Sequence, residues 1–445
     1  MPPSPRTWSR WAMLANARLA DLCDSIVDCP HSTPVWTSSG VIVLRNQNIR
    51  NGRLDLSERS YTDEAHFLER TRRALPAEGD LVITREAPMG EVCMIPPDLR
   101  CCLGQRMVLL RPNRHHAEPR YLLYALQSAA VQNEIGVNEG TGSTVSNLRI
   151  PLLEALPIPI RSLPEQRAIA HILGTIDSKI DLNLRLGSTL DSFARALFNS
   201  WFVQFDPVRD KALGSDLALP RGIADLFPKS FSDSAFGAIP RGWSVGSILQ
   251  NASLRSGGTP KTDRAEFWGG GISWASAKDV SQSRGTFLIG TERTITQQGL
   301  DESATQLIPA LCSVVVARGA TTGRMVLLGE AMAMNQTCYA LESRTDTPFA
   351  LYCELREAID RIVHSAHGSV FATITTDTFA TSKVVTAPQE LRQAFEGLVA
   401  PLFHRILAAT YESRTLAALR DMLLPKLISG ELRIRDAERV VADVA

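Results

Sequence analysis

Several short motifs in the sequence are typical of catalytic or nucleotide-binding sites, and each lacks the residues that would complete it. Residues 63–66 spell the DEAH box of helicases, but that box works beside a phosphate-binding loop, and the chain contains no Gly-Lys dipeptide. Residues 140–142 (Gly-Thr-Gly) lack the third glycine of a dinucleotide fingerprint. The Asn/Asp-Pro-Pro-Tyr/Phe tetrapeptide that grips adenine in methyltransferases is absent, as is a nucleophile elbow. The sequence therefore predicts no catalytic residues.

The residue types that commonly bind metals, cysteine and histidine, do not cluster in the sequence. The eight cysteines form no Cys-x-x-Cys pair, and His115-His116 lacks further ligands at metal spacing. This pattern predicts no metal site and indicates reduced thiols, as in the cytoplasm. No run approaches eighteen apolar residues, and the first residues lack the apolar core of a signal peptide. We therefore expect a cytoplasmic protein without a membrane span.

The elements that position polar residues follow from an internal repeat. Residues 81–95 align with 314–328 and place Arg85 on Arg318, while 104–110 align with 335–341 and place Gln105 on Gln336. Residues 189–198 align with 415–424 in the same way. Two copies of about 225–230 residues fill the chain, and each is a globular part followed by a helical part. The globular parts combine short β-branched runs with helical patterns at 120–135 and 348–366, which predicts α+β domains.

The helical parts carry apolar residues at heptad spacing. The first seam consists of Ile169, Leu173, Ile176, Ile180, Asn183, Gly187, Leu190, Ala194, Leu197 and Trp201. The second consists of Leu391, Phe395, Leu398, Leu402, Arg405, Ala409, Glu412, Leu416, Leu419 and Leu423. A lone helix of this length would expose its seam, so we expect the two helices to pair as an antiparallel coiled coil. The alternative is that each helix packs on a separate core.

These patterns predict the boundaries of the parts. We expect a first domain at 1–162, a spacer helix at 163–205, a linker at 206–239, a second domain at 240–386, a second spacer helix at 387–432 and a tail at 433–445. The linker contains Pro207, Pro220 and Pro228, and each helix begins directly after a proline, Pro164 or Pro388.

The helical region gives the chain a resemblance to a known family. Residues 163–209 (LPEQRAIAHILGTIDSKIDLNLRLGSTLDSFARALFNSWFVQFDPVR) closely resemble the central conserved region of specificity (S) subunits of type I restriction–modification enzymes. Residues 416–434 resemble their distal conserved region, and residues 256–280 (SGGTPKTDRAEFWGGGISWASAKDV) resemble the opening of a target-recognition domain. The first domain has CPHSTPVW at 29–36 instead of this opening.

The resemblance implies a DNA-binding specificity subunit without chemistry of its own. Two target-recognition domains would each read one half of a bipartite sequence in double-stranded DNA. The helices would dock two modification (M) subunits, which bind S-adenosylmethionine and methylate adenine, and restriction (R) subunits would use ATP and Mg²⁺. No cofactor is expected on this chain. Its net charge of zero, from 47 basic and 47 acidic residues, is compatible with DNA binding if the partner subunits share phosphate neutralisation.

Repeated architecture suggests DNA contacts at equivalent loops of the two copies. Arginine and lysine would contact guanine or phosphate, and asparagine and glutamine would contact adenine. The candidates are Arg45, Asn46, Gln47, Asn48, Arg50, Arg85, Gln105 and Ser143 in the first copy, and Trp274, Ser276, Lys278, Arg318, Gln336 and Ser369 in the second. The alternative for Arg85 and Arg318 is structural, since domains that read different sequences should differ where they read.

The partner surface is predicted from large apolar residues at the ends of the helices. These are Phe198, Trp201, Phe202 and Phe205 after the first helix, and Leu423, Leu424, Leu427 and Ile428 after the second. The alternative is that these residues cap the recognition domains internally. A different function, a standalone nuclease or methyltransferase with tandem DNA-reading domains, would need a catalytic motif, and the sequence contains none. A coiled-coil scaffold would leave the two repeated domains unexplained.

Overall fold

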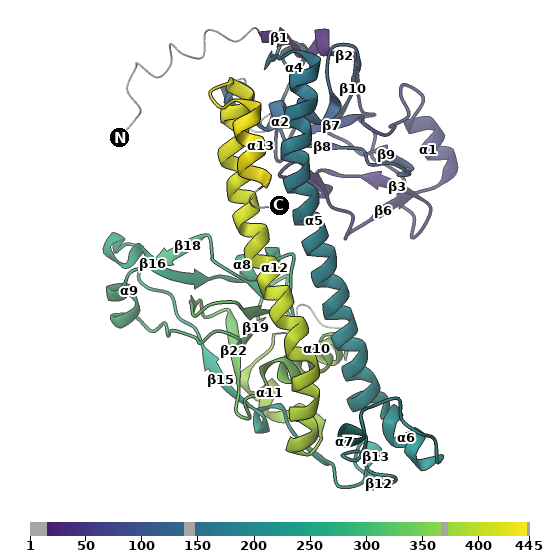
Figure 1. Cartoon of the computed structure of the whole chain (residues 1–445), viewed down its shortest axis with the longest axis vertical. Coiled ribbons are helices and arrows are strands. Elements are labelled where there is room, and N and C mark those ends of the chain that lie inside the picture. The colour runs from purple at the N-terminus through teal and green to yellow at the C-terminus, as the bar shows by residue number, and fades with distance from the viewer. Residues whose placement is uncertain (1–15, 138–146, 366–372, 443–445) are drawn as a thin grey trace. The chain divides into compact units, whose positions relative to one another are not determined.

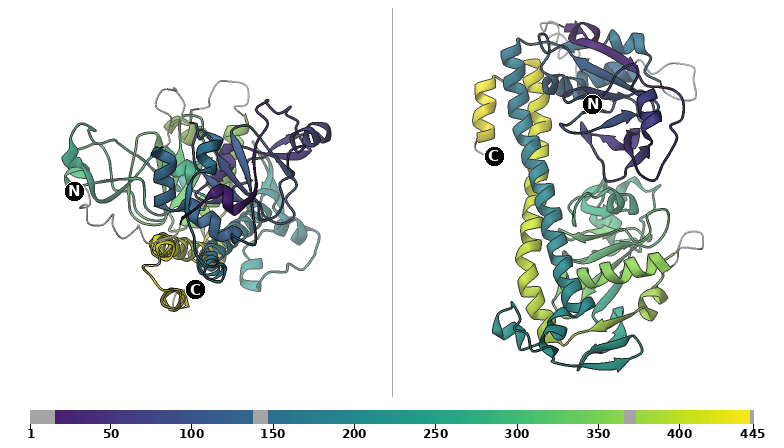
Figure 2. Two further views of the ribbon diagram at one scale, coloured as in Figure 1. Left: turned by 90° about the horizontal axis from the view of Figure 1, so that it is seen from above. Right: turned by 90° about the vertical axis from the view of Figure 1, so that its right-hand side faces the viewer.

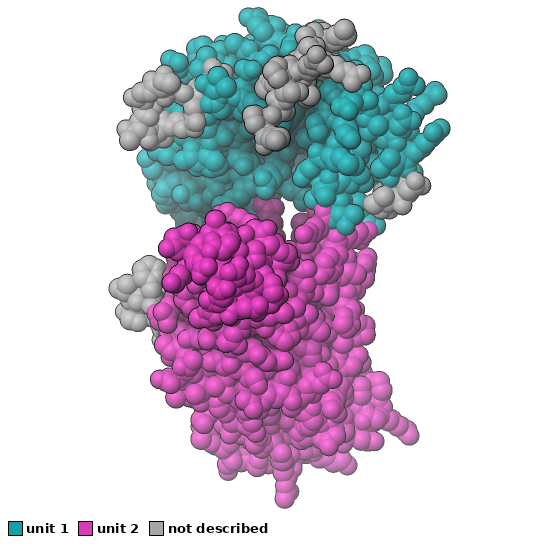
Figure 3. Space-filling model, turned by 90° about the vertical axis from the view of Figure 1, so that its left-hand side faces the viewer, with its two compact units in different colours: residues 1–179, 415–445 teal, residues 180–414 magenta. Residues whose placement is uncertain are grey.

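The computed structural model describes residues 16–137, 147–365 and 373–442, and the chain divides into two compact units (Figure 3). Unit 1 comprises residues 1–179 and 415–445, and unit 2 comprises residues 180–414. Each unit contains a globular domain with parts of two long helices, α5 (Leu163–Phe198) and α12 (Gln389–Ser429) (Figure 1). We call residues 16–162 domain 1 and residues 240–386 domain 2.

Domain 1 is a mixed α+β domain with two main sheets. One sheet has the strand order β2-β10-β7-β8, and the other has the order β6-β3-β9. The strands are β1 (Asn16–Arg18), β2 (Cys23–Asp28), β3 (Val41–Leu44), β4 (Ile49–Arg50), β5 (Arg53–Leu54), β6 (Ser60–Thr62), β7 (Leu81–Thr84), β8 (Val92–Met94), β9 (Cys101–Leu103), β10 (Met107–Pro112) and β11 (Pro157–Pro159). The helices are η2 (Leu19–Leu22), η3 (Asn46–Asn48), α1 (Glu64–Arg70), α2 (Pro119–Gln127), α3 (Ala129–Val137) and α4 (Ile150–Glu154).

Domain 2 has the same plan, with one more strand in its larger sheet. Its sheets have the orders β15-β22-β19-β20-β17 and β18-β16-β21. The strands are β14 (Ser244–Ser247), β15 (Ala252–Ser256), β16 (Trp268–Ala275), β17 (Phe287–Leu288), β18 (Arg293–Ile295), β19 (Ser313–Val316), β20 (Met325–Leu328), β21 (Ala333–Met334), β22 (Cys338–Ser343) and β23 (Lys383–Thr386). The helices are η5 (Ile248–Gln250), η6 (Ala265–Phe267), α8 (Ala277–Gln282), α9 (Gln297–Asp301), α10 (Pro348–Ser365) and α11 (Thr376–Thr381).

The sheets confirm the internal repeat. In domain 1, β7 lies between β10 and β8 and is antiparallel to both, and in domain 2 β19 lies between β22 and β20 in the same way. The parallel pair of β3 and β9 has its counterpart in the parallel pair of β16 and β21. The predicted α+β class with two tandem domains is therefore confirmed.

The long helices pair in antiparallel fashion, as the seams predicted. Within unit 1, Asp177 of α5 accepts a hydrogen bond from Arg420 of α12 at 2.8 Å. Within unit 2, the amide of Asn183 donates to Glu412 at 3.0 Å, so the polar interruptions of the two seams meet. Residue numbers rise along one helix as they fall along the other. In both units the two helical segments run side by side (Figure 2).

The second seam was predicted one position out of place between residues 398 and 405. Leu398 is 39% exposed, and the fully buried residues are Val399 and Phe403. Phe403 stacks on Phe349 of α10 with ring centroids 4.7 Å apart. The buried face of this part of α12 is therefore turned toward the core of domain 2, since it packs on that domain as well as on α5.

Residues 199–243 connect the first long helix to domain 2 through short elements. These are η4 (Asn199–Gln204), α6 (Asp206–Ala212), α7 (Arg221–Ala224), β12 (Phe231–Ser234) and β13 (Gly237–Pro240), and α13 (Ile434–Ala442) follows α12. Lys211 fastens this connection, because its ammonium donates to the carbonyls of Ala224 and Phe227 at 2.8 and 2.6 Å. Within the described ranges, no helix is both long enough and apolar enough to cross a membrane.

Candidate DNA-reading surface

Three segments of each domain meet at one edge, which we call the loop edge. In domain 1 these are residues 44–48, 85–86 and 104–106, and in domain 2 they are residues 275–279, 317–318 and 335–337. The amide of Gly104 donates to the carbonyl of Leu44 at 2.8 Å, and the amide of Arg85 donates to that of Arg106 at 2.8 Å. The loop edge of domain 1 is thus fixed by backbone hydrogen bonds.

Domain 2 repeats both backbone hydrogen bonds. The amide of Asn335 donates to Ala275 at 2.9 Å, and that of Ala317 donates to Thr337 at 2.8 Å. Backbone groups fix this frame whatever the side chains are. The same edge can therefore present different side chains in the two domains.

The backbone pairing corrects the alignment of the two copies by one residue. Arg85 and Ala317 donate the equivalent hydrogen bonds, so Arg85 corresponds to Ala317 and Arg318 corresponds to Glu86. The prediction that Arg85 and Arg318 are equivalent is wrong. Amides at the ends of the two turns, Gly90 and Gly323, donate back to Thr84 and Val316, so the second turn is one residue longer.

The shift explains why the two arginines have different surroundings. Arg85 is 9% exposed, and its guanidinium donates to Asp28 at 2.8 and 3.0 Å and to the carbonyl of Leu148 at 2.9 Å. Arg318 is exposed and has no hydrogen bond or ion pair to another residue of the described ranges. These contacts favour the structural alternative for Arg85 and keep Arg318 available to a ligand.

Gln105 and Gln336 do occupy equivalent positions, and both hold the segment that opens the domain. Gln105 donates to the carbonyl of His31, and Gln336 accepts a hydrogen bond from the hydroxyl of Thr259. Close packing requires a glycine two residues before Thr259, because a Cβ on Gly257 would lie 2.3 Å from the carbonyl oxygen of Asn335. CPHSTPVW in domain 1 and GGTP in domain 2 thus each contact the loop edge of their own domain.

A third equivalence concerns the turn formed by Arg45–Asn48 in domain 1 and by Ser276–Asp279 in domain 2. The amide of Arg45 donates to Asn48 Oδ1 at 2.9 Å, and the amide of Ser276 donates to Asp279 Oδ2 at 2.9 Å. Both interactions cap a short helix, η3 in domain 1 and α8 in domain 2. Asn48 is buried by this role and donates to two further carbonyls.

The other candidates differ in how far they are free. Arg45, Gln47, Arg50 and Lys278 are exposed, although Lys278 pairs with Glu292 at 2.6 Å. Asn46 is partly buried and donates to the carbonyl of Glu86. Trp274 is 5% exposed, and its indole donates to Gly258 at 3.0 Å. Ser143 and Ser369 lie outside the described residues. Contact of any of these residues with DNA remains a prediction.

The structure adds residues that the sequence analysis missed. Val35 and Trp36 are each 47% exposed, in the segment that Gln105 holds. The guanidinium of Arg45 lies 5.3 Å from the centre of the Trp36 ring. Arg106, next to Gln105, is also exposed and contacts Glu86. The only signal for Trp36 was the replacement of the glycine-rich opening by CPHSTPVW.

Comparison with known proteins identifies these two domains. A model of the type I restriction modification DNA specificity domain matches residues 18–190 and again residues 240–391. The chain belongs to the type I restriction–modification specificity subunits. It is 24% identical over 402 residues to the type I restriction enzyme HindI specificity subunit of Haemophilus influenzae, covering 80% of this chain and 87% of that one. It is also 24% identical over 394 residues to the MjaIX specificity subunit of Methanocaldococcus jannaschii, covering 85% of this chain and 83% of that one.

A solved structure agrees with the fold. The S subunit of a type I restriction–modification system from M. genitalium matches with a TM-score of 0.50 at 16% identity, covering 93% of this chain and 95% of that one. The two regions that the family model matches, residues 18–190 and 240–391, include both loop edges. The sequence resemblance to specificity subunits is thus confirmed.

The apolar residues predicted to bind partner subunits are buried inside this specificity subunit. Phe198, Trp201 and Phe202 surround Phe395 of α12, with ring centroids 5.2 to 5.7 Å from it. Trp201 is 2% exposed, and Phe227 of the connecting segment covers it at 5.1 Å. Leu423 and Leu427 are 2% and 1% exposed. The packing favours the alternative that these residues cap the chain's own core.

The remaining motifs of the specificity subunit have structural explanations. The carboxylate of Asp63 accepts a hydrogen bond from the amide of His66 at 2.9 Å, so the DEAH sequence begins helix α1. No group of three or more metal-binding side chains occurs in the part of the chain that the structure describes. The described cysteines are free, and burial raises the pKa of the Cys101 thiol to about 12, so this thiol is protonated at neutral pH.

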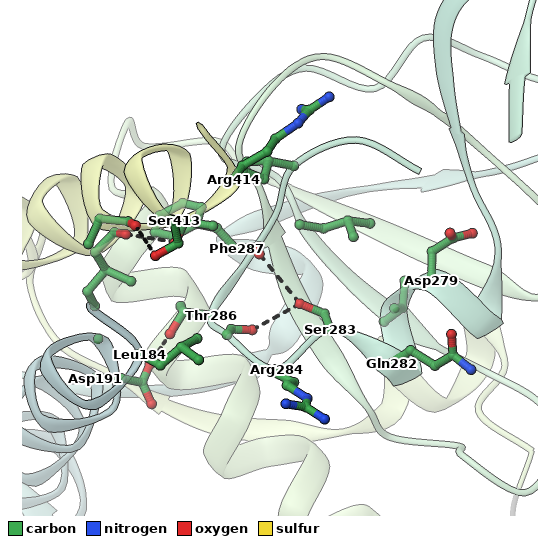
Figure 4. Close-up of a pocket in the computed structure, with 18 of the residues that line it drawn as sticks. Leu184, Asp191, Asp279, Gln282, Ser283, Arg284, Thr286, Phe287, Ser413 and Arg414 are labelled. Atoms are coloured by element: carbon green, nitrogen blue, oxygen red, sulfur yellow. Dashed lines mark hydrogen bonds between the residues drawn. The ribbon is translucent and has the colours of Figure 1, made fainter. Parts of the chain in front are cut away.

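Unit 2 of the specificity subunit contains a groove of about 780 Å³ (Figure 4). It lies between the long helices and residues 279–292, and its lining includes Asp191, Arg284 and Arg414. Arg284 and Arg414 extend in different directions (Figure 4), and Asp191 accepts a hydrogen bond from Thr286 at 3.2 Å. The groove is therefore lined by charged side chains of both signs.

Proposed function

We propose that this specificity subunit reads a bipartite sequence in double-stranded DNA, one half-site with each domain, and has no catalytic activity of its own. The observation that carries the proposal is the pair of loop edges. Equivalent backbone hydrogen bonds build both edges, while the outward side chains differ: Arg318 in domain 2 replaces Glu86 in domain 1. A shared frame with different side chains is what two readers of different half-sites need.

The partners and cofactors of the system belong to the same proposal. We expect the subunit to assemble in the cytoplasm with two M subunits and with R subunits. S-adenosylmethionine, ATP and Mg²⁺ would bind those partners, and this chain would bind none of them. Methyl transfer, DNA cleavage or ATP hydrolysis by the purified chain, free of partner subunits, would contradict this division of labour.

Trp201 and its neighbours are buried and therefore are not accessible to a partner subunit. The partner surface must then lie elsewhere on the helices. Leu182 and Phe193 of α5 are 57% and 59% exposed. Eleven residues separate them, which is about three helical turns and places both on one face. We propose this face, with the exposed Leu398 of α12, as the contact for an M subunit. Substituting Phe193 by alanine should reduce the amount of M subunit that copurifies and leave the melting temperature unchanged.

Arg318 and Lys278 test the DNA proposal directly. The target is first mapped from the modified adenines in cells that carry the complete system. Arg318→Ala and Lys278→Ala are then compared in the reconstituted complex, on DNA with the mapped sequence and on scrambled DNA. A lost base contact should cost about 1–3 kcal/mol on the mapped sequence only, whereas a lost phosphate contact should weaken both about equally.

The two variants also compare an arginine without an ion pair among the described residues, Arg318, with a lysine that already has one, Lys278. Lys278 is held by Glu292, so we expect Lys278→Ala to have the smaller effect. If neither substitution changes binding while the complex still assembles, the loop edge of domain 2 is not the reading surface.

A further inference from the structure

Besides the exposed Arg45 of domain 1, each loop edge carries one exposed arginine, and the two arginines stand at positions that do not correspond. In domain 2 it is Arg318, which follows β19, and in domain 1 it is Arg106, which precedes β10. The position of Arg106 is taken by Thr337 in domain 2, and the position of Arg318 is taken by Glu86 in domain 1. The two domains have therefore exchanged the strand that supplies the cation.

The two arginines differ in what holds them. Arg106 Nε lies 3.1 Å from Glu86 Oε2, with 54% of the arginine side chain and 19% of the glutamate side chain exposed. Among the described residues, neither terminal NH₂ group of Arg106 donates a hydrogen bond, and Arg318 has no partner at all. The hydroxyl of Thr337 donates to Asn335 at 2.7 Å instead. Only the arginine of domain 1 is held by a carboxylate.

Glu86 is itself fixed by its neighbours. Its carbonyl accepts a hydrogen bond from the side chain of Asn46, and the residue before it, Arg85, is anchored to Asp28. A carboxylate that contacts Nε leaves the two terminal NH₂ groups of the guanidinium, which donate no hydrogen bond among the described residues, available to a ligand. That fork is the part of arginine that pairs with O6 and N7 of guanine.

The backbone conformation of Arg106 is also unusual. Its φ angle is +66°, in the left-handed region that non-glycine residues rarely adopt, whereas Thr337 is not among the residues with positive φ. Such a conformation costs free energy and persists where the surrounding structure holds it in place. Here the carbonyl of Arg106 accepts the amide of Arg85 at 2.8 Å, and the side chain contacts Glu86.

We propose that Glu86 is a positioning residue that orients Arg106 toward a guanine of the first half-site and offsets its charge against the DNA backbone. Domain 1 then reads through a held arginine and domain 2 through the free Arg318. The inference rests on the proposed function and assigns the chemistry by which the first half-site is recognised. Neutralising Glu86 should release Arg106 to nearby phosphates, so that binding gains affinity and loses selectivity.

The test uses the reconstituted complex and three DNAs: the mapped target, the target with its first half-site scrambled, and the target with its second half-site scrambled. We expect Glu86→Gln to reduce discrimination at the first half-site about tenfold. This loss lies within the discrimination that one bidentate arginine–guanine pair provides against a wrong base. Discrimination at the second half-site should not change. Affinity for scrambled DNA should rise, and the slope of log affinity against log salt should steepen by about 0.9.

Glu64→Gln is the matched control. Glu64 pairs with Arg100 on the same domain and is likewise a glutamate facing an arginine, but it lies at the start of α1, away from the loop edge. Discrimination by this variant should equal that of the wild type. Arg106→Ala should also lose discrimination at the first half-site, and its affinity for scrambled DNA should fall instead of rising.

Four results separate the outcomes. Glu86→Gln that discriminates like the wild type overturns the inference, as does Arg106→Ala with unchanged discrimination. If Glu86→Gln fails to fold, Arg106→Lys replaces it, because lysine keeps the charge and loses the fork; unchanged discrimination by that variant also overturns the inference. A wild-type complex that discriminates at neither half-site contradicts the proposed function itself.

Discussion

Asp177 joins domain 1 to both long helices within unit 1, and its removal should be strongly destabilising. Its carboxylate accepts hydrogen bonds from Tyr124 at 2.6 Å, Arg420 at 2.8 Å and Arg53 at 3.1 Å. Side-chain exposure is 23% for Asp177, 19% for Arg53 and 17% for Arg420. Asp177→Asn would remove the carboxylate that Arg53 and Arg420 share, and among the described residues Arg420 would keep only its ion pair with the exposed Asp421.

The magnitude follows from this burial. Breaking a buried ion pair costs about 3–5 kcal/mol, and the remaining exposure places this one at the lower end, about 3 kcal/mol. The pair of Arg195 and Asp360 is the matched control, because it is exposed and its atoms are 3.5 Å apart. Asp360→Asn should cost about 0.5 kcal/mol or less. Hydrogen exchange of the α2 amides measures the loss for Asp177→Asn within unit 1, and exchange of the α10 amides measures the loss for Asp360→Asn within unit 2.

The pH dependence adds a second measurement. Burial raises the pKa of the Asp177 carboxyl, but the hydrogen bond from Tyr124 and the charge of Arg420 outweigh burial and hold this pKa below its usual value. A lowered pKa in the folded state stabilises the fold above the pKa of the unfolded chain, about 3.9, and the effect disappears as the pH falls through the folded value. The difference between wild type and Asp177→Asn should therefore shrink below about pH 4. Equal losses for Asp177→Asn and Asp360→Asn at neutral pH would refute the reasoning.

Three further predictions concern single side chains. Trp201→Ala should lower the free energy of unfolding by about 3–5 kcal/mol in a denaturant titration, since the ring is enclosed by aromatic residues; a loss as small as that of the exposed Phe193→Ala would contradict its place in the core. Gly257→Ala should displace Thr259 from Gln336, because the new Cβ meets two backbone carbonyls at 2.3 Å, and weaken binding of the second half-site in a competition assay; full affinity for that half-site would argue against it. Trp36→Ala should leave stability within about 0.5 kcal/mol and weaken binding of the first half-site only, and equal weakening at both half-sites would count against a local contact.

The sequence was sufficient for those parts of the fold that depend on periodicity. Heptad spacing predicted both long helices, and the meeting of Asn183 with Glu412 accounts for the polar interruptions in their seams. The displaced seam near Val399 shows the limit of this approach. Periodicity locates a buried face relative to one partner, whereas this part of α12 packs on α5 and on α10 at once.

The candidate site was less predictable, because it depends on backbone register. Sequence similarity aligned Arg85 with Arg318, but the turn in domain 2 is one residue longer. As a result Arg85 points inward to Asp28, whereas Arg318 is exposed. The burial of Trp201 was equally hard to predict, since the residues that cover it, Phe227 and Phe395, come later in the chain. Contacts of this kind leave no local pattern in the sequence.

The division of the chain into units has a consequence for the order of its synthesis. Unit 2 is one continuous stretch, but unit 1 needs residues 415–445, which are translated after all of unit 2. Until then Ile169, Leu173 and Ile176, buried in the finished subunit, lack the part of α12 that carries Leu416 and Leu423. Domain 1 is thus translated first and completed last, and a chain stopped before residue 415 should carry a finished unit 2 beside an uncovered apolar helix.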